Sequence, residues 1–337
     1  MNFPERHRRR VAVWLFAVCV MIFGMIVLGG ATRLTGSGLS IMEWAPIMGS
    51  LPPMSDSEWQ RLFGLYRDIP QYKLLNTGME LAGFKQIFLL EYLHRLWGRL
   101  IGLAFLLPLL GFIALGAIPR RFIPRLALLF VLGGLQGAVG WFMVASGFET
   151  GNVAVAPVRL VLHLVLALAL YAALLWTALG VLHAQPTAGP AAPRRWTLAA
   201  LLLISLTITA GGLVAGLHAG LDYNSFPLMD GRLVPAAYTL NWLENIAAVQ
   251  FNHRALATLT LLVATAAAIS GLRHRVAPRA MLCLGATVVL QYGLGIVVLL
   301  RVVPIPEAVA HQGMAVLLLT ACLIALHSQY FSQRTEP

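Results

Sequence analysis

The chain has 337 residues, of which 59% are hydrophobic and only 11% are charged. Soluble domains use about 25% charged residues, so this composition excludes an ordinary soluble protein. It predicts an integral membrane protein embedded in the lipid bilayer. The net charge of +11 does not indicate nucleic-acid binding, because the arginines fall between apolar segments rather than along one soluble face.

Eight apolar segments follow one another along the chain. They cover residues 11–32, 100–118, 126–148, 160–182, 196–217, 255–272, 280–300 and 308–329. Each approaches or exceeds the about 18 to 20 residues with which a helix crosses a bilayer. We therefore expect an all-α integral membrane protein with eight transmembrane helices. The first apolar run is longer than a signal-peptide core, so we expect it to stay in the protein.

Arginines are concentrated in alternate connections between these segments. They occur at 6–10, 120–125, 194–195 and 273–279. Connections rich in Lys and Arg remain in the cytoplasm. We therefore expect both termini to be cytoplasmic and the long loop at 33–85 to lie outside.

The two halves of the chain carry the same landmarks in the same order. Each half has a Gly-Gly pair, a His-Arg pair, a glutamine motif and a second histidine after a proline, at Gly29-Gly30, His94-Arg95, Gln136 and His163, and at Gly211-Gly212, His253-Arg254, Gln291 and His311. Because each half has an even number of spans, both halves enter the membrane from the same side as parallel repeats. We predict two four-helix bundles, at 1–182 and 197–337, joined by a cytoplasmic linker at 183–196.

The four repeated histidines are candidate metal ligands. His94, His163, His253 and His311 lie near the starts of spans that begin on the outer face, so one layer of the membrane would hold them all. A single membrane histidine is more often a hydrogen-bonding or interfacial residue, but two pairs at equivalent positions indicate metal binding. Two inward-facing histidines can hold the iron of one haem. We expect one haem in each half.

One acidic residue distinguishes the two halves. Glu91 precedes His94 by three residues and shares its helical face, whereas the equivalent position in the second half is Gln250. Since an amide does not ionise near neutral pH, we expect a catalytic role for Glu91 and an electron carrier in the second half. The alternative is that Glu91 forms an ion pair with Arg95.

The arginines next to the histidines have two interpretations. Arg95, Arg99 and Arg254 can bind the anionic propionates of a haem through their planar donor groups. They can equally reach the outer headgroups. The sequence leaves both open, and the same holds for Arg33.

With these residues in view, the chain resembles the haem A synthases over essentially its whole length. The similarity is carried by residues 29–44, by Glu91-Tyr-Leu-His-Arg95 and by residues 224–231. The resemblance implies haem B as a cofactor held by His253 and His311, and haem O as a substrate flanked by His94 and His163. It implies that Glu91 is essential, and that the reaction oxidises a ring methyl of haem O to a formyl group, giving haem A for the terminal oxidase.

The cysteines refine this resemblance. Cys19, Cys283 and Cys322 all lie within predicted spans, so the chain lacks the outer-loop cysteine pair of some bacterial relatives. It resembles instead the branch shared by mitochondria and some proteobacteria. The short N-terminal segment does not resemble a transit peptide, which favours the bacterial inner membrane. The resemblance also points to haem O synthase and oxidase assembly factors as partners. It leaves the electron acceptor and self-association open.

Two other functions stay open at this stage. One is a non-catalytic electron-transfer cytochrome with two b-type haems, and the other is a transporter of haem or another anionic ligand, suggested by the parallel repeat. Glu91 opposite Gln250 favours the enzyme, because an electron carrier has no evident need for one carboxylate. A transporter has no need for four paired ligands.

Overall fold

The computed structural model describes residues 5–44, 48–182 and 190–331, and these residues form helices, turns and loops without a strand. In this part of the chain, eight helices are long and apolar enough to cross a membrane. They are α1 (Glu5–Leu34), α4 (Leu81–Ala114), α5 (Ile123–Ala145), α6 (Pro157–Leu182), α7 (Ala191–Gly216), α8 (Ile246–Arg273), α9 (Pro278–Leu300) and α10 (Ile305–Tyr330). The predicted all-α membrane fold is confirmed.

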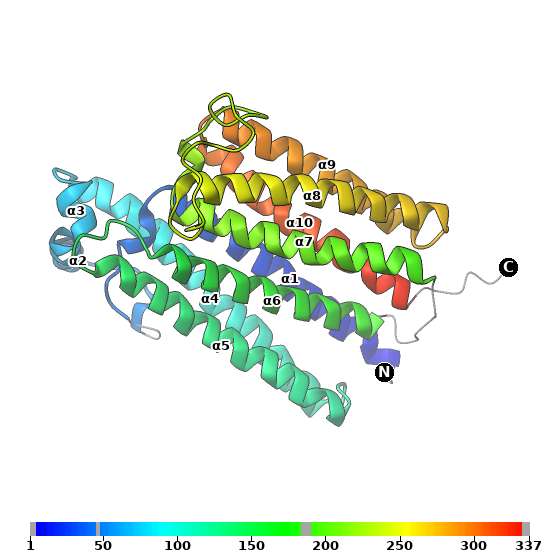
Figure 1. The fold of residues 1–337 in the computed structure, drawn as a ribbon. Helices are drawn as coiled ribbons and strands as arrows, with labels where there is room; N and C mark the ends of the chain where they lie inside the picture. The colour runs from blue at the N-terminus through cyan, green and yellow to red at the C-terminus, as the bar shows by residue number, and fades with distance from the viewer. Residues whose placement is uncertain (1–4, 45–47, 183–189, 332–337) are drawn as a thin grey trace.

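The sequence specifies where several of these helices begin. Proline stands in the first turn of α5, α9 and α10, where its fixed φ angle suits the helix and its missing N–H leaves no unpaired donor. Within each helix the apolar side chains face lipid or neighbouring helices, while the backbone satisfies its own hydrogen bonds. The helices run side by side, and the start of α1 lies at the same end of the molecule as the end of α10 (Figure 1).

The helices pack as two groups of four. α1 and α5 both contact α4 and α6, and α7 and α9 both contact α8 and α10. We call the first group the N-terminal unit and the second the C-terminal unit. The two units meet where α6 contacts α7, where α1 contacts α10, and where α6 contacts α10. The same packing order in both units agrees with a duplicated bundle, and the parallel relation between them stays a prediction.

The predicted linker at 183–196 falls only partly within the structure. Residues 183–189 lie outside the described residues, and residues 191–196 are helical and belong to α7.

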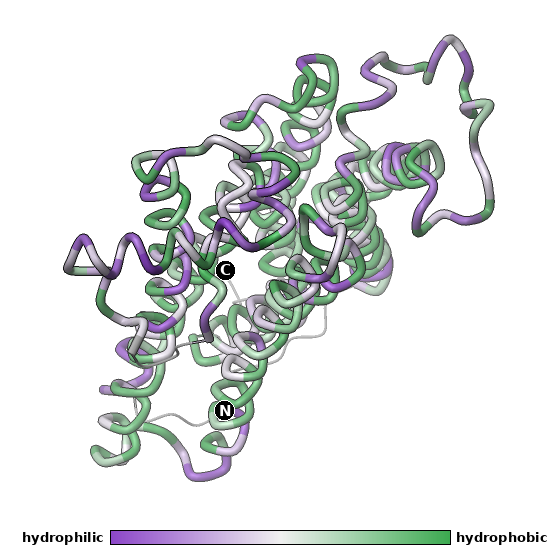
Figure 2. The backbone as a smooth tube through the Cα atoms, turned by 90° about the vertical axis from the view of Figure 1, so that its left-hand side faces the viewer, coloured by the Kyte–Doolittle hydropathy of each residue, from purple (hydrophilic) through white to green (hydrophobic). Residues whose placement is uncertain are grey.

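The connection between α1 and α4 is folded into a cap at the end of the molecule that we call the loop-rich end. It contains two short helices, α2 (Asp56–Asp68) and α3 (Pro70–Leu74), and a 3-10 turn at Ser37–Leu39 (Figure 1). Viewed from this end, hydrophilic residues gather in the connections and hydrophobic residues dominate the helices (Figure 2).

The cap has a hydrophobic core of its own, made by Leu39, Leu62, Phe63, Tyr66, Ile69, Phe84 and Phe88. Phe84 and Phe88 come from α4, which begins at Leu81 instead of near residue 100 as the apolar run predicts. The helix is longer because its first turns are buried against the cap rather than in lipid. His94 therefore lies well inside a helix.

Candidate functional site: two histidine pairs at one depth

In the N-terminal unit, each predicted ligand faces a glycine on a neighbouring helix. A Cβ atom built on Gly29 of α1 would lie 3.1 Å from Nε2 of His94 on α4. A Cβ atom built on Gly140 of α5 would lie 2.8 Å from Cε1 of His163 on α6. His94 and His163 lie on α4 and α6 of one four-helix unit, in which α1 and α5 each contact both of these helices. The structure thus brings the two histidines together, and the absence of side chains on two helices makes room for their rings.

The C-terminal unit repeats this arrangement. A Cβ atom on Gly211 of α7 would lie 3.0 Å from Cε1 of His253 on α8, and one on Gly295 of α9 would lie 2.9 Å from Cε1 of His311 on α10. His253 and His311 lie on α8 and α10, and α7 and α9 each contact both of these helices. The second pair of predicted ligands is therefore assembled like the first.

The four glycines share one depth. Each lies five residues before the last residue of its helix, Leu34 for α1, Ala145 for α5, Gly216 for α7 and Leu300 for α9. At about 1.5 Å per residue, this depth is about 7.5 Å from the loop-rich ends of these helices. The four histidines that face the glycines therefore lie in one layer.

Two glutamines contact one histidine of each pair. The amide Nε2 of Gln136 lies 3.1 Å from Nδ1 of His163 and donates to the His163 backbone oxygen at 2.9 Å. The amide Nε2 of Gln291 lies 3.5 Å from Nε2 of His311. The sequence shows these glutamines as repeat landmarks without a role. The missed signal is their spacing, since each stands one helical turn before the glycine that faces the same histidine.

The tautomer of one ligand follows from its hydrogen bond. Nδ1 of His253 lies 3.1 Å from the backbone oxygen of Thr207, and a carbonyl oxygen can only accept, so this ring nitrogen carries the proton. Its Nε2 lone pair is then available for a metal.

Two histidines in each unit suit a haem iron, because the porphyrin supplies the other ligands of the iron. Among the described residues, no group of three or more His, Cys, Asp and Glu side chains could hold a metal ion. A bare zinc ion uses three or four protein ligands, whereas a haem uses one or two axial ligands. Within the same residues, Nδ1 of His311 and the Oε1 atoms of Gln136 and Gln291 are buried without a hydrogen-bond partner. These polar atoms beside the rings also suit a bound prosthetic group.

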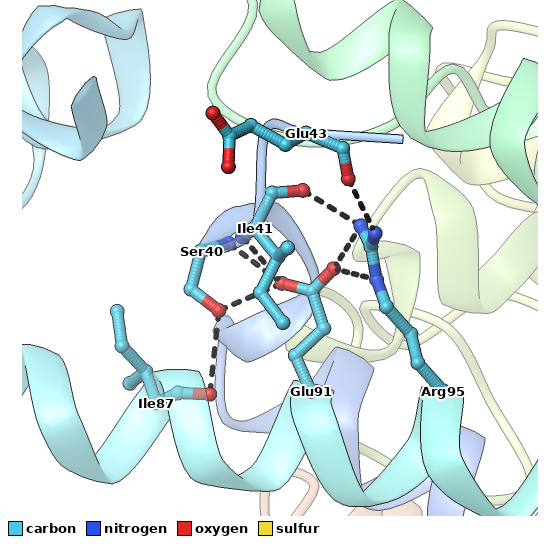
Figure 3. Close-up of polar contacts among 6 residues, drawn as sticks. All are labelled: Ser40, Ile41, Glu43, Ile87, Glu91 and Arg95. Atoms are coloured by element: carbon cyan, nitrogen blue, oxygen red, sulfur yellow. Dashed lines mark hydrogen bonds and ion pairs between the residues drawn. The ribbon is translucent and has the colours of Figure 1, made fainter. Parts of the chain in front are cut away.

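Glu91 is buried, with 3% of its surface exposed. Its Oε2 accepts hydrogen bonds from the backbone N–H of Ser40 at 2.8 Å, the backbone N–H of Ile41 at 2.9 Å and the Ser40 hydroxyl at 2.7 Å. Its Oε1 accepts two from Arg95, at 3.0 and 2.7 Å (Figure 3). The ion pair with Arg95 that the sequence offers as an alternative is confirmed, and both carboxylate oxygens serve only as acceptors, which suits an ionised carboxylate.

Arg95 extends this network to the backbone that follows α1. Its guanidinium group donates to the carbonyl oxygens of Ile41 at 2.6 Å and Glu43 at 3.1 Å (Figure 3). Glu91 and Arg95 together, which we call the N-terminal clamp, fix the 40–43 segment on α4. Glu91 stands three residues, about one helical turn, before His94 on the same helix.

Gln250 occupies the equivalent place in the C-terminal unit and is also buried, at 2% exposure. Its amide donates to the backbone oxygens of Ala219 at 2.8 Å and Asp222 at 2.5 Å, and its own oxygen accepts from Arg254 at 3.0 Å. Hydrogen bonds therefore run from the loop to Glu91 in one unit and from Gln250 to the loop in the other.

Arg254 behaves as Arg95 does. It donates to the carbonyl oxygens of Tyr223 at 2.5 Å and Ser225 at 2.8 Å. We call Gln250 and Arg254 the C-terminal clamp. Nε of Arg254 is buried without a hydrogen-bond partner in the described residues, so one donor remains available to a further acceptor.

Arg95 and Arg99 also border a cavity of about 450 Å³ between α4 and the cap. Arg61 lies in its wall and is hydrogen bonded to Glu43 and Glu58. Its guanidinium group holds the pKa of the Glu43 carboxyl below the ordinary value. This ion triad joins α2 to the segment that the N-terminal clamp holds.

These features define a multi-pass membrane protein with two half-buried histidine pairs, a donor set of the kind that holds a haem. The profile of the cytochrome oxidase assembly protein family matches residues 12–323. The haem A synthase of Granulibacter bethesdensis is 60% identical, over 98% of this chain and 90% of the relative. The haem A synthase of Rhodospirillum centenum is 49% identical, over 95% of this chain and 88% of the relative.

The chain therefore belongs to the haem A synthase family of cytochrome oxidase assembly proteins. The resemblance carried by residues 29–44, by Glu91-Tyr-Leu-His-Arg95 and by residues 224–231 is confirmed.

Proposed function

We propose that the chain is a haem A synthase, a membrane oxidoreductase that converts haem O to haem A, and that its two units divide the work. The observation that carries this division is the duplicated histidine layer with a carboxylate clamp in only one unit. Family membership supports the reaction, and the two clamps support the division.

In the C-terminal unit, His253 and His311 hold haem B as a permanent cofactor. The Thr207 carbonyl orients the His253 ring so that Nε2 can ligate iron. The unpartnered Nε of Arg254 is a donor suited to a haem propionate. The C-terminal clamp has the amide of Gln250 where the N-terminal clamp has the carboxylate of Glu91. The absence of a carboxylate suits an electron carrier better than a site of chemistry.

In the N-terminal unit, His94 and His163 flank the substrate haem O. The bound iron and porphyrin supply the oxidative chemistry. The side chains of His94 and His163 orient the ring, and the clamped 40–43 segment closes the site towards the cap. Because both oxygens of Glu91 are already hydrogen bonded, we assign Glu91 a fixed negative charge beside the reacting ring in preference to a proton carrier.

The identity of the bound haems tests this proposal most simply. Haems extracted from the purified protein are separated and identified by mass. Haem B together with haem O or haem A supports the enzyme. Two equivalents of haem B with neither of the others would instead identify the chain as a di-haem electron-transfer cytochrome.

The arginine-rich connections support an orientation with both termini in the cytoplasm of a bacterium and the cap outside the inner membrane. Haem O synthase and oxidase assembly factors are the partners that fit this location. Reporter fusions after Arg121 or Arg275 are expected to be cytoplasmic. An external reporter at either position would reverse the orientation.

A further inference from the structure

The two units meet along two equivalent seams that differ in chemistry. On the α1–α10 seam, Gln312 of the C-terminal unit lies against Gly30 of the N-terminal unit, where a Cβ atom would be only 2.5 Å from the Gln312 Oε1. The Gln312 amide donates to the Ile26 carbonyl oxygen on α1 at 2.6 Å. Gly30 is thus the opening in α1 that admits a polar side chain from the other unit.

The α6–α7 seam has the same plan with an apolar contact. Leu164 of the N-terminal unit packs on Gly212 of the C-terminal unit, where a Cβ atom would lie 3.3 Å from Leu164 Cδ2 and 3.1 Å from Val161 Cγ2. These tips of flexible side chains can give by a few tenths of an ångström. Among the described residues, close packing holds this seam without a hydrogen bond between α6 and α7.

Both seams connect a histidine of one unit with a histidine of the other. Gln312 follows His311 directly, and its partner Gly30 follows Gly29, which faces His94. In the other seam Leu164 follows His163, and Gly212 follows Gly211, which faces His253. Each seam therefore joins a histidine of one unit to a histidine of the other through directly adjacent residues.

Among the described residues, α1 makes two side-chain hydrogen bonds to the C-terminal unit and α6 makes one, between the Tyr171 and Thr320 hydroxyls at 2.8 Å. Besides receiving the hydrogen bond from Gln312, α1 sends Arg33 across to the Ala215 carbonyl oxygen at 3.0 Å. A hydrogen bond in an apolar environment is directional and costly to leave unmade. An apolar contact has no preferred direction. A displacement of α1 is therefore transmitted to α10 more faithfully than a displacement of α6 is transmitted to α7.

We propose that the Gly30–Gln312 contact is the coupling element between the two haem sites, so that occupancy of the N-terminal site is sensed at His311. Gln312 is a positioning residue in this role, because it acts through its neighbour His311 and through α1. The proposal rests on the proposed function, which assigns haem B to the C-terminal unit and the substrate to the N-terminal unit. By linkage, haem B must alter the affinity for substrate by the same factor.

The test uses the full-length protein loaded with haem B and, as the probe, zinc-substituted haem O, which has no signal in electron paramagnetic resonance. Probe binding is followed by porphyrin fluorescence, and the haem B site by its low-spin resonance. In the unchanged protein, probe binding is expected to shift this resonance. Gly30→Ala, which forces the Gln312 amide off Ile26, is expected to abolish the shift. Leu164→Ala, a change in the same unit at the other seam, is expected to keep it.

A second pair of variants changes the C-terminal unit and measures probe binding in the N-terminal unit. Gln312→Leu, confined to the C-terminal unit, is expected to raise the dissociation constant of the probe at least about fivefold, the lower end of typical coupling between sites. Gly212→Ala is expected to leave it within about twofold. The double variant Gly30→Ala/Gln312→Ala should still show no shift, because it lacks the amide that binds the Ile26 carbonyl oxygen, although the new methyl group has room.

The outcomes separate the two proposals. Equal behaviour of the two seams, or no shift of the haem B resonance on probe binding in the unchanged protein, would overturn the coupling role while leaving the proposed function intact. If Gly30→Ala does not fold, Gln312→Leu decides the question alone. Absence of haem B from the unchanged protein would instead overturn the proposed function, and the coupling role with it.

Discussion

The N-terminal and C-terminal clamps hold equivalent backbone segments. Their arginines make the same hydrogen bonds, whereas Glu91 accepts hydrogen bonds from its segment and Gln250 donates them. Arg95 binds the carbonyl oxygens of Ile41 and Glu43, which lie twelve and fourteen residues after Gly29. Arg254 binds those of Tyr223 and Ser225, which stand at the same distances after Gly211. The arginine contacts of the repeat are therefore conserved between the two units, residue by residue.

The two clamps differ in the backbone groups that face Glu91 and Gln250. Next to Glu91 the loop presents two backbone N–H groups and a hydroxyl, whereas next to Gln250 it presents two carbonyl oxygens. Hydrogen bonds to a charged group contribute about 1.5 to 3 kcal/mol each, against about 0.5 to 1.5 kcal/mol for neutral ones. Each loop thus suits only its own clamp residue, and the carboxylate is confined to one unit by backbone geometry as well as by sequence.

The largest expected effect comes from the ligands of the C-terminal unit. His253→Ala or His311→Ala should remove nearly all haem B, because loss of one axial ligand opens the iron and weakens retention of the haem. The low-spin absorption spectrum of the purified variants measures this. A full complement of unchanged low-spin haem B in either variant would exclude that histidine as a ligand.

Exchange of the clamp residue in the N-terminal unit should come next. Glu91→Gln removes the negative charge and places an amide N–H₂ opposite donors, so it disturbs the loop as well as the charge. We expect haem A formation to fall by about 10² to 10³-fold, the range typical of losing one preorganised electrostatic group, with haem O accumulating and haem B content near normal.

A matched control separates the charge of Glu91 from the anchoring of the loop. Ser40→Ala deletes one hydrogen bond to the carboxylate, from a hydroxyl 2.7 Å away, and leaves the charge in place. We expect a loss of activity below about tenfold in this variant. Equal losses in Ser40→Ala and Glu91→Gln would identify Glu91 as a structural anchor only.

The reverse exchange in the C-terminal unit should affect stability rather than chemistry. Gln250→Glu would direct a carboxylate at the carbonyl oxygens of Ala219 and Asp222, with only Arg254 to compensate. A buried charge facing acceptors costs about 3 kcal/mol or more, so the melting temperature of the haem B form should drop clearly. An unchanged melting temperature would show that the loop can invert its hydrogen bonds.

The smallest effect concerns the ion triad of the cap. Because Arg61 holds the pKa of Glu43 below its ordinary value, the pair stabilises the cap above the ordinary glutamate pKa. This stabilisation is lost as the pH falls through the lowered value. Arg61→Gln should therefore destabilise the protein at neutral pH by less than about 1 kcal/mol, and the difference should vanish in acid. A loss in Arg61→Gln that stayed the same in acid would exclude the ion pair as the cause.

Much of the architecture can be predicted from the sequence, because apolar length alone fixes which segments span a bilayer. The eight spans and the four histidines follow from run length and from the repeat. The start of α4 does not, because residues 81–99 are held helical by burial of Phe84 and Phe88 in the cap core rather than by an apolar run. That core comes from segments far apart in the sequence.

The contacts of Glu91 show the same limit. Its spacing from Arg95 predicts the ion pair, but no local pattern predicts that the N–H groups of Ser40 and Ile41 meet the other oxygen. The glycines opposite the histidines could have been predicted in part. Gly140 and Gly295 each follow a repeated glutamine by four residues, and this spacing places both on one face of a helix.

The division of labour between the two units is tested most directly by removing both ligands of one unit at a time and measuring the haem B that remains. We expect His94→Ala/His163→Ala to keep haem B at the level of the unchanged protein while producing no haem A. We expect His253→Ala/His311→Ala to lose haem B. Loss of haem B from the first variant, or its retention by the second, would contradict the assignment of the cofactor to the C-terminal unit.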